Sequence, residues 1–456
     1  MFDPNRWGIP KAAVERLAKD LRRFYRRFRA CFKTRTHNGG RHALRYWRGQ
    51  LTMEDQRNFA NIERRVKPGA DGQDLQHFMT DSPWSGQAVY RQIQRDIKRK
   101  PVLRAGGVLI LDESADGKAG PNSAGAARQW NGRMGKIDLC QVVTALAWAH
   151  PATGLWTLVD AQLFLPGHWF DEAHGPLRQE LGIPATRVFQ TKPQLGLEMI
   201  GRAVRQGLPF GRVAADDLYG RNRAFRAGLG QLLYALDVPL STPVSLSPRA
   251  KERLAAIDLA VRRKTRWRRV RVRSSERGVL VADFAVERVW TPNHQDQLEA
   301  LWLVIRRDPN GKLSFTLLND PPDTAAQALI EASCQRHFVE CVFEEAKSEL
   351  GWDDFCAQKY LAWEHHTALT AAALWFIAEL KLDWKQSYQR DPQLNKVFEL
   401  EVLPALSTAN VRELLQAMLP LPKLGATQAR QLVVKHLVCR SRSTSSRLKK
   451  QLENSS

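Results

Sequence analysis

Apolar positions in the first hundred residues recur at the spacing of amphipathic helices. Between Leu21 and Phe28, cationic residues alternate with aromatic or apolar ones at close to helical intervals. A second predicted helix runs from Gly86 to Lys100 and ends in consecutive cations. The pattern predicts a helical region over residues 1–100 whose basic faces suit binding to the backbone of DNA. An ordinary solvated amphipathic helix would show the same pattern.

The pattern changes after Pro101. Short apolar runs bounded by Gly and Pro turns are typical of buried strands, and they occupy 108–111, 141–148 and 155–159. A helical stretch over 197–206 precedes a further strand at 211–215. Strands that alternate with a helix predict an α/β fold over residues 101–243, with a mixed sheet flanked by helices.

A third pattern begins near Pro243. Residues 262–273 are intensely basic, and their later half alternates as a strand would. A hairpin is predicted to join 301–307 to 313–318 through a turn that contains Asn-Gly. We therefore predict a β-rich insertion over residues 244–322.

Helical spacing returns after the insertion. Residues 323–390 predict helices that complete the core, and the apolar helix over 361–380 is most simply a core element. Residues 391–456 predict a helical C-terminal region that ends in a Ser/Arg/Lys-rich tail. This tail, residues 440–456, is expected to be disordered.

The chain carries far more positive charge than solubility requires. Its 456 residues contain 69 Lys and Arg against 47 Asp and Glu, which gives a net charge of +22. Within residues 1–50, 14 cations face 3 acids, a surplus of 11 (14 − 3). Such a field predicts a polyanionic partner, and nucleic acid fits it better than a membrane surface.

The remaining composition is that of an intracellular protein. Residues 1–5 are not followed by an apolar core, so no secretory signal is expected. The most apolar helical segment, 369–377, is shorter than the about 20 residues that a membrane span requires. The six cysteines form no Cys-x-x-Cys pair, and we expect them to be reduced in a cytoplasmic compartment.

Three carboxylates lie at positions where an acidic side chain is unusual. Asp112 and Asp216 each end a run that is apolar enough to be a buried strand. Glu340 lies between Arg336 and Lys347 at steps of four and seven residues, which return to one face of a helix. Two strand-end acids and one helical acid could therefore meet at an edge of the sheet.

Converging carboxylates predict a metal site. They repel one another in a partly buried site unless a divalent cation neutralises them, and hard oxygen ligands favour Mg²⁺ or Mn²⁺. Two such ions about 3.5 to 4 Å apart can activate a water and stabilise the leaving oxygen of a phosphoryl displacement. The three acids therefore predict metal-dependent phosphodiester cleavage.

Each of these signals also has a simpler structural interpretation. An acid at a strand end often caps a helix or binds turn amides, and a helix carboxylate is usually solvated. Asp217 competes with Asp216 for the same role, and Glu344 competes with Glu340. The run Glu364-His365-His366 is interpreted as structural, because adjacent residues of a helix point about 100° apart.

With these residues in place, the chain resembles the DDE transposases of bacterial insertion sequences, within the RNase H-like superfamily. One subgroup of that family carries Tyr, two residues, Arg, three residues, Glu, six residues and Lys. Arg336, Glu340 and Lys347 occupy the last three of these positions, and Ser333 replaces the Tyr. Further similar segments span most of the chain from residue 75 to 370, namely 111–114, 127–132, 135–142, 163–169, 215–220 and 345–353.

The resemblance implies an RNase H-like core, interrupted between its second and third acids by the β-rich insertion. It implies that Asp112, Asp216 and Glu340 bind the catalytic Mg²⁺, or Mn²⁺, and that Arg336 and Lys347 contact the DNA backbone. The replacement of the signature Tyr leaves this metal site unchanged and removes one DNA-positioning contact.

The insertion adds further expected DNA contacts, namely Arg266, Arg268 and Trp267. In relatives that pass through a DNA hairpin, a Trp of the insertion stacks on a flipped base, a contact worth about 1 to 3 kcal/mol. Trp267, Trp290 and Trp302 are the alternatives for that role, and each is also compatible with ordinary packing.

The resulting prediction is a transposase that cuts insertion-sequence ends and joins the freed 3′-hydroxyl to target DNA. It would act on double-stranded DNA as a homodimer in a synaptic complex, in the bacterial cytoplasm and associated with the nucleoid. Two other classes remain. A non-catalytic DNA-binding protein derived from such an enzyme would not need all three acids, and a structure-selective nuclease on the same fold would cut without joining ends.

Overall fold

The N-terminal region is helical, as the apolar spacing predicts. The computed structural model describes residues 11–54, 56–70, 72–250, 253–275, 278–387 and 407–453. Its first helices are α1 Lys11–Phe28, α2 Gly40–Thr52, α3 Phe59–Val66, α4 Gln73–Thr80 and α5 Gly86–Arg99. The apolar stripe of α1 is buried, and Phe24 on this stripe packs on Trp47 of α2 and on Phe376. The cations of α1 are thereby left on its other faces.

The core is a mixed sheet whose strand order is β4-β3-β1-β5-β6 along one part of its width. Strands β1 Val108–Gly117, β3 Lys136–His150 and β4 Leu155–Phe164 are antiparallel. Strands β5 Arg212–Ala215 and β6 Tyr234–Val238 run parallel to β1. Three antiparallel strands followed by two parallel ones, flanked by helices, confirm the predicted α/β RNase H-like fold.

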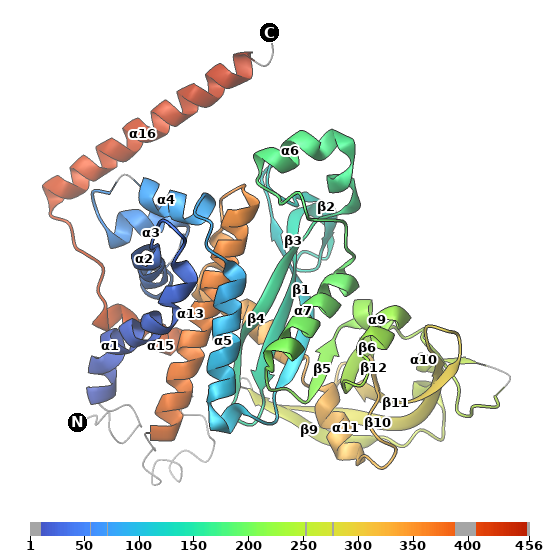
Figure 1. Ribbon diagram of the computed structural model, residues 1–456. Helices are drawn as coiled ribbons and strands as arrows, with labels where there is room; N and C mark the ends of the chain where they lie inside the picture. Colours follow the sequence, from blue (N-terminus) through green and yellow to red (C-terminus); the bar gives the residue numbers. More distant parts are fainter. Residues whose placement is uncertain are drawn as a thin grey trace.

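Two long helices lie between this sheet and the first four helices (Figure 1). Helix α13, Tyr360–Ser387, lies with α5 beside β4, and helices α1 to α4 lie beyond them. Because α13 is enclosed by these neighbours, nearly all of its residues from 362 to 380 are buried, as its uniform apolarity predicts. Helix α7, Lys192–Gln206, packs on β3 and β4.

The predicted insertion is not a separate lobe, because its strands continue the core sheet. Strand β12 Leu313–Leu318 pairs with β6, and β11 Leu298–Arg307, β10 Gly278–Pro292 and β9 Arg268–Ser275 follow outward in that order. The predicted hairpin between β11 and β12 is confirmed. The nine strands named so far and β2 Ala127–Asn131, which lies beside β3, form one ten-stranded sheet in the described part of the chain.

Short elements connect these layers. They are α6 Gly175–Glu180, α8 Asp217–Gly220, α9 Arg223–Gly228, the strand pair β7 Pro243–Val244 and β8 Leu254–Ala255, α10 Ala256–Val261, α11 Ala326–Ser333 and α12 His337–Glu344. A π-helical turn, η6 Glu345–Glu349, continues α12.

The C-terminal tail corrects one prediction. Residues 440–453, expected to be disordered, form the second half of α16, Ala426–Glu453, which extends away from the body (Figure 1). Helix α15, Thr408–Met418, instead packs near α1 and α2. Lys, Arg and Leu are good helix formers, and this explains how a basic, Ser-rich segment can still be helical. Among the described residues, no helix is long and apolar enough to cross a membrane.

Gly220 allows α8 to approach β6 closely. A Cβ atom at this position would lie 1.9 Å from the backbone oxygen of Asp237, which cannot move without shifting the strand. We expect Gly220→Ala to lower the free energy of unfolding by about 2 kcal/mol or more, measured by urea denaturation. Gly175→Ala is the matched control, because a Cβ at that helical glycine meets no atom within 4 Å, and an equal loss there would contradict the argument.

Candidate active site

Asp112 and Asp216 lie side by side where the parallel pairing of β1 with β5 stops. Asp216 follows the end of β5, but Asp112 lies within β1, which continues to Gly117 along β3, so the predicted strand end at residue 111 is wrong. Leu111 of β1 is in register with Ala215 of β5, so the residue that follows each of them reaches the same edge. Burial raises the pKa of Asp112 to about 6. Burial, followed by the charge of Asp112, raises the pKa of Asp216 to about 7. The structure thus brings the first two predicted acids together in a setting that resists two negative charges.

Glu340 joins these acids through a shared cation, Arg336. Arg336 precedes α12, and its Nη1 donates to Asp112 Oδ2 at 2.9 Å. Its Nη2 donates to Glu340 Oε1 at 3.3 Å, while the Glu340 side chain remains 63% exposed. All three predicted acids therefore lie around one place, and a guanidinium group stands between the first and the third.

A fourth acid, Asp237 of β6, was not predicted. Its Oδ2 accepts from Arg336 Nε at 2.8 Å, and its Oδ1 accepts from the Thr316 hydroxyl at 2.8 Å. Burial opposes the charge of Arg336, but Asp237, Asp112 and Glu340 more than compensate and raise its pKa above the ordinary value. The sequence did contain a signal for Asp237, because this acid interrupts an apolar run just as Asp112 follows one.

The two rival acids lie outside this arrangement. Asp217 is exposed and begins α8, whereas the Asp216 carboxylate accepts from the Leu218 amide and caps that helix. Glu344, at the end of α12, is exposed as Glu340 is, but it is Glu340 that pairs with Arg336. The geometry therefore favours Asp216 over Asp217 and Glu340 over Glu344. We call the resulting group the acidic cluster, and its members are Asp112, Asp216, Asp237 and Glu340.

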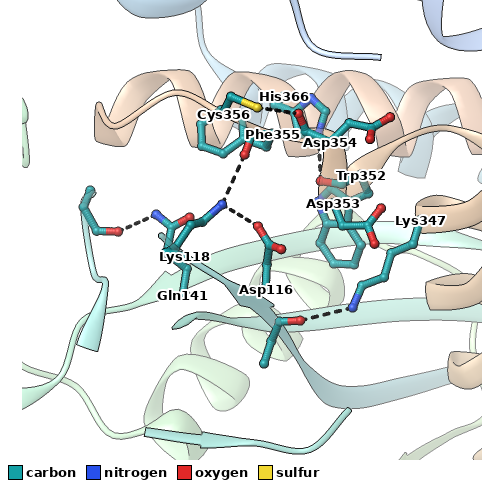
Figure 2. A network of polar contacts seen from close by, with 12 residues as sticks. Asp116, Lys118, Gln141, Lys347, Trp352, Asp353, Asp354, Phe355, Cys356 and His366 are labelled. Carbon is teal, nitrogen blue, oxygen red and sulfur yellow. Dashed lines mark hydrogen bonds and ion pairs between the residues drawn. The ribbon is translucent and has the colours of Figure 1, made fainter. Parts of the chain in front are cut away.

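Lys347, in η6, reaches β1 at Ala115, beyond the acids, and it lies in a network of polar contacts with Asp116 and Asp353 nearby (Figure 2). Its Nζ donates to the Ala115 carbonyl at 3.2 Å, so Arg336 and Lys347 both contact β1. The predicted regular helix does not span these residues, because Arg336 precedes α12 and Lys347 lies in the π-helical turn. Burial and the nearby charge of Arg133 lower the pKa of Lys347. Lys347 also lines a small cavity of about 30 Å³, whose lining includes Asp116 and Asp353.

The predicted contacts of the insertion lie at the other end of the sheet. Arg266 and Arg268 are exposed around the start of β9, which is six strands from β1 in the order β1-β5-β6-β12-β11-β10-β9. Trp267 is half-buried, and the Arg307 guanidinium lies 4.1 Å from its ring centroid. In the part of the chain that the structure describes, no contact joins these residues to the acidic cluster. Trp302 similarly packs under Arg288.

The two histidines of α13 are structural, as predicted. His365 is buried between the carbonyls of Met79 and Trp84, and His366 is buried between the Tyr46 hydroxyl and the carbonyl of Trp352. Burial lowers the pKa of each imidazole to about 4. Their side chains thus bind the N-terminal helices to the core.

The acidic cluster has the donor chemistry of a divalent metal site. Asp112 and Asp216 offer hard oxygen ligands, and their raised pKa values reflect a need for nearby positive charge. Among the described residues, however, no group of three or more His, Cys, Asp or Glu side chains is assembled to hold a metal ion. The guanidinium of Arg336 instead lies between Asp112 and Glu340 and donates to both.

Comparison with known proteins identifies the family of this chain. The family model of the DDE superfamily endonucleases matches residues 27–287, which include Asp112 and Asp216 and end before Glu340. The chain is also 25% identical over 323 residues to a protein of Microchaete diplosiphon described as a probable transposase for insertion sequence element IS701. The match covers 66% of this chain and 74% of that protein. The family model covers more than half of the chain, and this match establishes that the chain belongs to the DDE superfamily of endonucleases.

Proposed function

We propose that this protein is a DNA transposase that cleaves the ends of an insertion sequence and transfers the freed 3′ ends into target DNA. The observation that carries the proposal is the position of Asp112 beside Asp216, where the pairing of β1 with β5 stops, with Glu340 linked to Asp112 through Arg336. The named relative, a probable transposase, supports the choice of reaction within the family. Both steps would be phosphoryl transfers at one site.

Each residue of the site would have a separate role. Asp112, Asp216 and Glu340 would hold Mg²⁺, or Mn²⁺, which supplies an activated water and stabilises the leaving oxygen. Arg336 and Lys347 would contact DNA phosphates on the face of β1 where they now contact protein. The exposed Arg266 and Arg268, with Trp267, would bind DNA at the far edge of the sheet. A homodimer would hold two element ends together.

Arg336 would change partners as the site becomes active. Its guanidinium pairs with three carboxylates, and in the loaded site a divalent ion would balance part of that charge instead. Release of Asp112 and Glu340 would free Nη1 and Nη2 for a phosphate, while Asp237 keeps hold of Nε. Asp237 would thus position Arg336 in both states.

Metal binding should depend steeply on pH. Asp112 and Asp216 must lose their protons to bind an ion, and their pKa values are about 6 and about 7. We expect the affinity for Mn²⁺, measured by isothermal titration calorimetry, to fall by about tenfold per pH unit below pH 7, and more steeply below pH 6. Equal affinities at pH 5.5 and pH 8 would show that these carboxylates do not bind the metal.

Cleavage and joining of labelled DNA test the proposed function directly. The substrate carries the inverted repeats that flank the gene, and the reactions contain Mg²⁺ or EDTA. Wild type should cut and join in Mg²⁺ alone, and Asp112→Ala, Asp216→Ala and Glu340→Ala should bind the DNA without cutting it. Glu344→Ala is the matched control for Glu340→Ala and should remain active.

The same assay separates the other classes. Binding without cleavage by wild type would favour a DNA-binding protein derived from such an enzyme. Cleavage without joining would favour a structure-selective nuclease.

A further inference from the structure

The ribbon formed by β2 and the start of β3 carries an unusual apolar tip. Trp130 is paired across the ribbon with Ile137, and their exposed fractions are 61% and 60%. Met134, in the connecting turn, is 56% exposed. Large apolar side chains are seldom left together in water without a partner surface, so we define Trp130, Met134 and Ile137 as the ribbon tip.

Cations surround the ribbon tip. Arg128, Arg133 and Lys136 are all exposed on the same short ribbon. Its one acid, Asp138, is half-buried, and its Oδ1 accepts from the amide of the next residue. The surface therefore combines an aromatic wedge with positive charge, a combination that suits a nucleic acid.

The ribbon tip points to the same side of the sheet as the acidic cluster. Asp112 is paired with Ala145 of β3, and cross-strand pairs project to one face. Ile137 is eight residues from Ala145, an even number, and the strand has no bulge between them, so Ile137 and its partner Trp130 lie on that face too. Eight residues span roughly 26 Å at about 3.3 Å each, less than one helical turn of duplex DNA.

A second contact ties the ribbon to the region of Lys347. Arg133, in the turn, pairs with Asp353 at 3.0 Å, and Asp353 lines the cavity that Lys347 enters (Figure 2). A phosphate that reached Lys347 would therefore also approach the base of the ribbon.

We propose that the ribbon tip is a DNA-contact surface that wedges Trp130 against a base step of the duplex within about one helical turn of the cleavage point. The inference rests on the proposed function, because it concerns the same DNA. Charge complementarity favours DNA over a second copy of this chain, since a copy would bring a net charge of +22 against the cations of the ribbon.

The wedge differs from the stacking residue expected in the insertion. Trp267 and Trp302 are each half-buried under an arginine, whereas Trp130 is 61% exposed. An indole can stack on a base only if it is accessible in the free protein, and Trp130 is accessible.

The test measures base unstacking and binding without catalysis. Full-length protein is mixed in EDTA with a duplex that carries the flanking inverted repeat, and permanganate reactivity of its thymines reports unstacking. Wild type should enhance reactivity near the element end. Trp130→Ala should abolish the enhancement and weaken binding about tenfold, while Trp130→Phe keeps most of both. Val204→Ala, a change at an apolar residue of α7 that is 48% exposed, should change neither.

Other outcomes would overturn the inference. Unchanged reactivity and binding in Trp130→Ala, beside a wild type that cleaves DNA, would remove the wedge and leave the proposed function intact. A wild type that binds no DNA would remove both. A change in the mass of the free protein on Trp130→Ala, measured by light scattering, would show that a second copy covers the ribbon tip instead. Circular dichroism of each variant checks folding.

Discussion

Asp216→Asn should abolish DNA cleavage and at the same time make the metal-free protein more stable. Loss of cleavage by at least about 10³-fold is expected, because the variant removes a charged ligand from the centre of the proposed metal site. Single-turnover cleavage in saturating Mg²⁺ measures it. DNA binding should persist, since the substitution leaves the surface cations in place.

The gain in stability follows from the raised pKa of Asp216, about 7. A folded-state pKa above the unfolded value means that the carboxyl favours folding when protonated, and that this stability is lost as the pH rises from about 4 through 7. At pH 8 the Asn variant avoids that loss, by an amount on the order of 2 kcal/mol after allowance for partial exposure. Urea denaturation in EDTA at pH 8 should reveal the gain, and the difference should shrink toward pH 4.

Asp217→Asn is the matched control for both effects. Asp217 is the next residue and is exposed, so its variant should retain cleavage and shift stability by less than about 0.5 kcal/mol. If the two variants behaved alike, or if Asp217→Asn alone lost activity, the assignment of the second acid to Asp216 would be wrong.

Arg336→Ala should destabilise the protein by about 3 kcal/mol at pH 8. The substitution leaves Asp112 and Asp237, both largely buried, without their common cation, and uncompensated buried charge is more costly than the pair itself. Denaturation at pH 8 and pH 5 measures the effect, which should be smaller at pH 5 because burial raises the pKa values of both acids and they then take up protons.

A double variant isolates this cause. Adding Asp237→Asn to Arg336→Ala removes one of the stranded charges and should restore part of the lost stability, whereas simple loss of packing would not be rescued. Arg133→Ala breaks an ion pair whose arginine is 63% exposed, and it should cost less than about 1 kcal/mol. A similar cost for Arg133→Ala and Arg336→Ala would contradict the argument.

The sequence predicts the core and its acids because local patterns determine them. The apolar run from Val108 to Leu111, bounded by turn residues, predicts a buried strand, although the strand continues past Asp112 to Gly117. Once β1 and β5 are parallel neighbours, Asp112 and Asp216 meet without further information. The histidines of α13 were also assigned correctly, from the directions of adjacent helix residues.

What the sequence does not predict depends on pairing at long range. Nothing in the pattern of β12 indicates that it pairs with β6 and joins the insertion to the core sheet. Asp237 gained its role only because that sheet brings β6 next to Arg336, which is 99 residues away in the chain. The exposure of Trp130 likewise could not be distinguished from burial by its alternating neighbours, since both faces of a strand alternate alike.

The unbroken sheet fixes the distances between the sites that lie on it. The ribbon tip, the acidic cluster and the basic strand β9 are attached to one hydrogen-bonded lattice, so the intervals between them are set by whole strands and whole residues rather than by linkers. Because a shift of one residue turns every side chain to the opposite face, these intervals cannot drift gradually during evolution. Lengthening the span between the acids and the basic edge would require the gain of an entire strand pair.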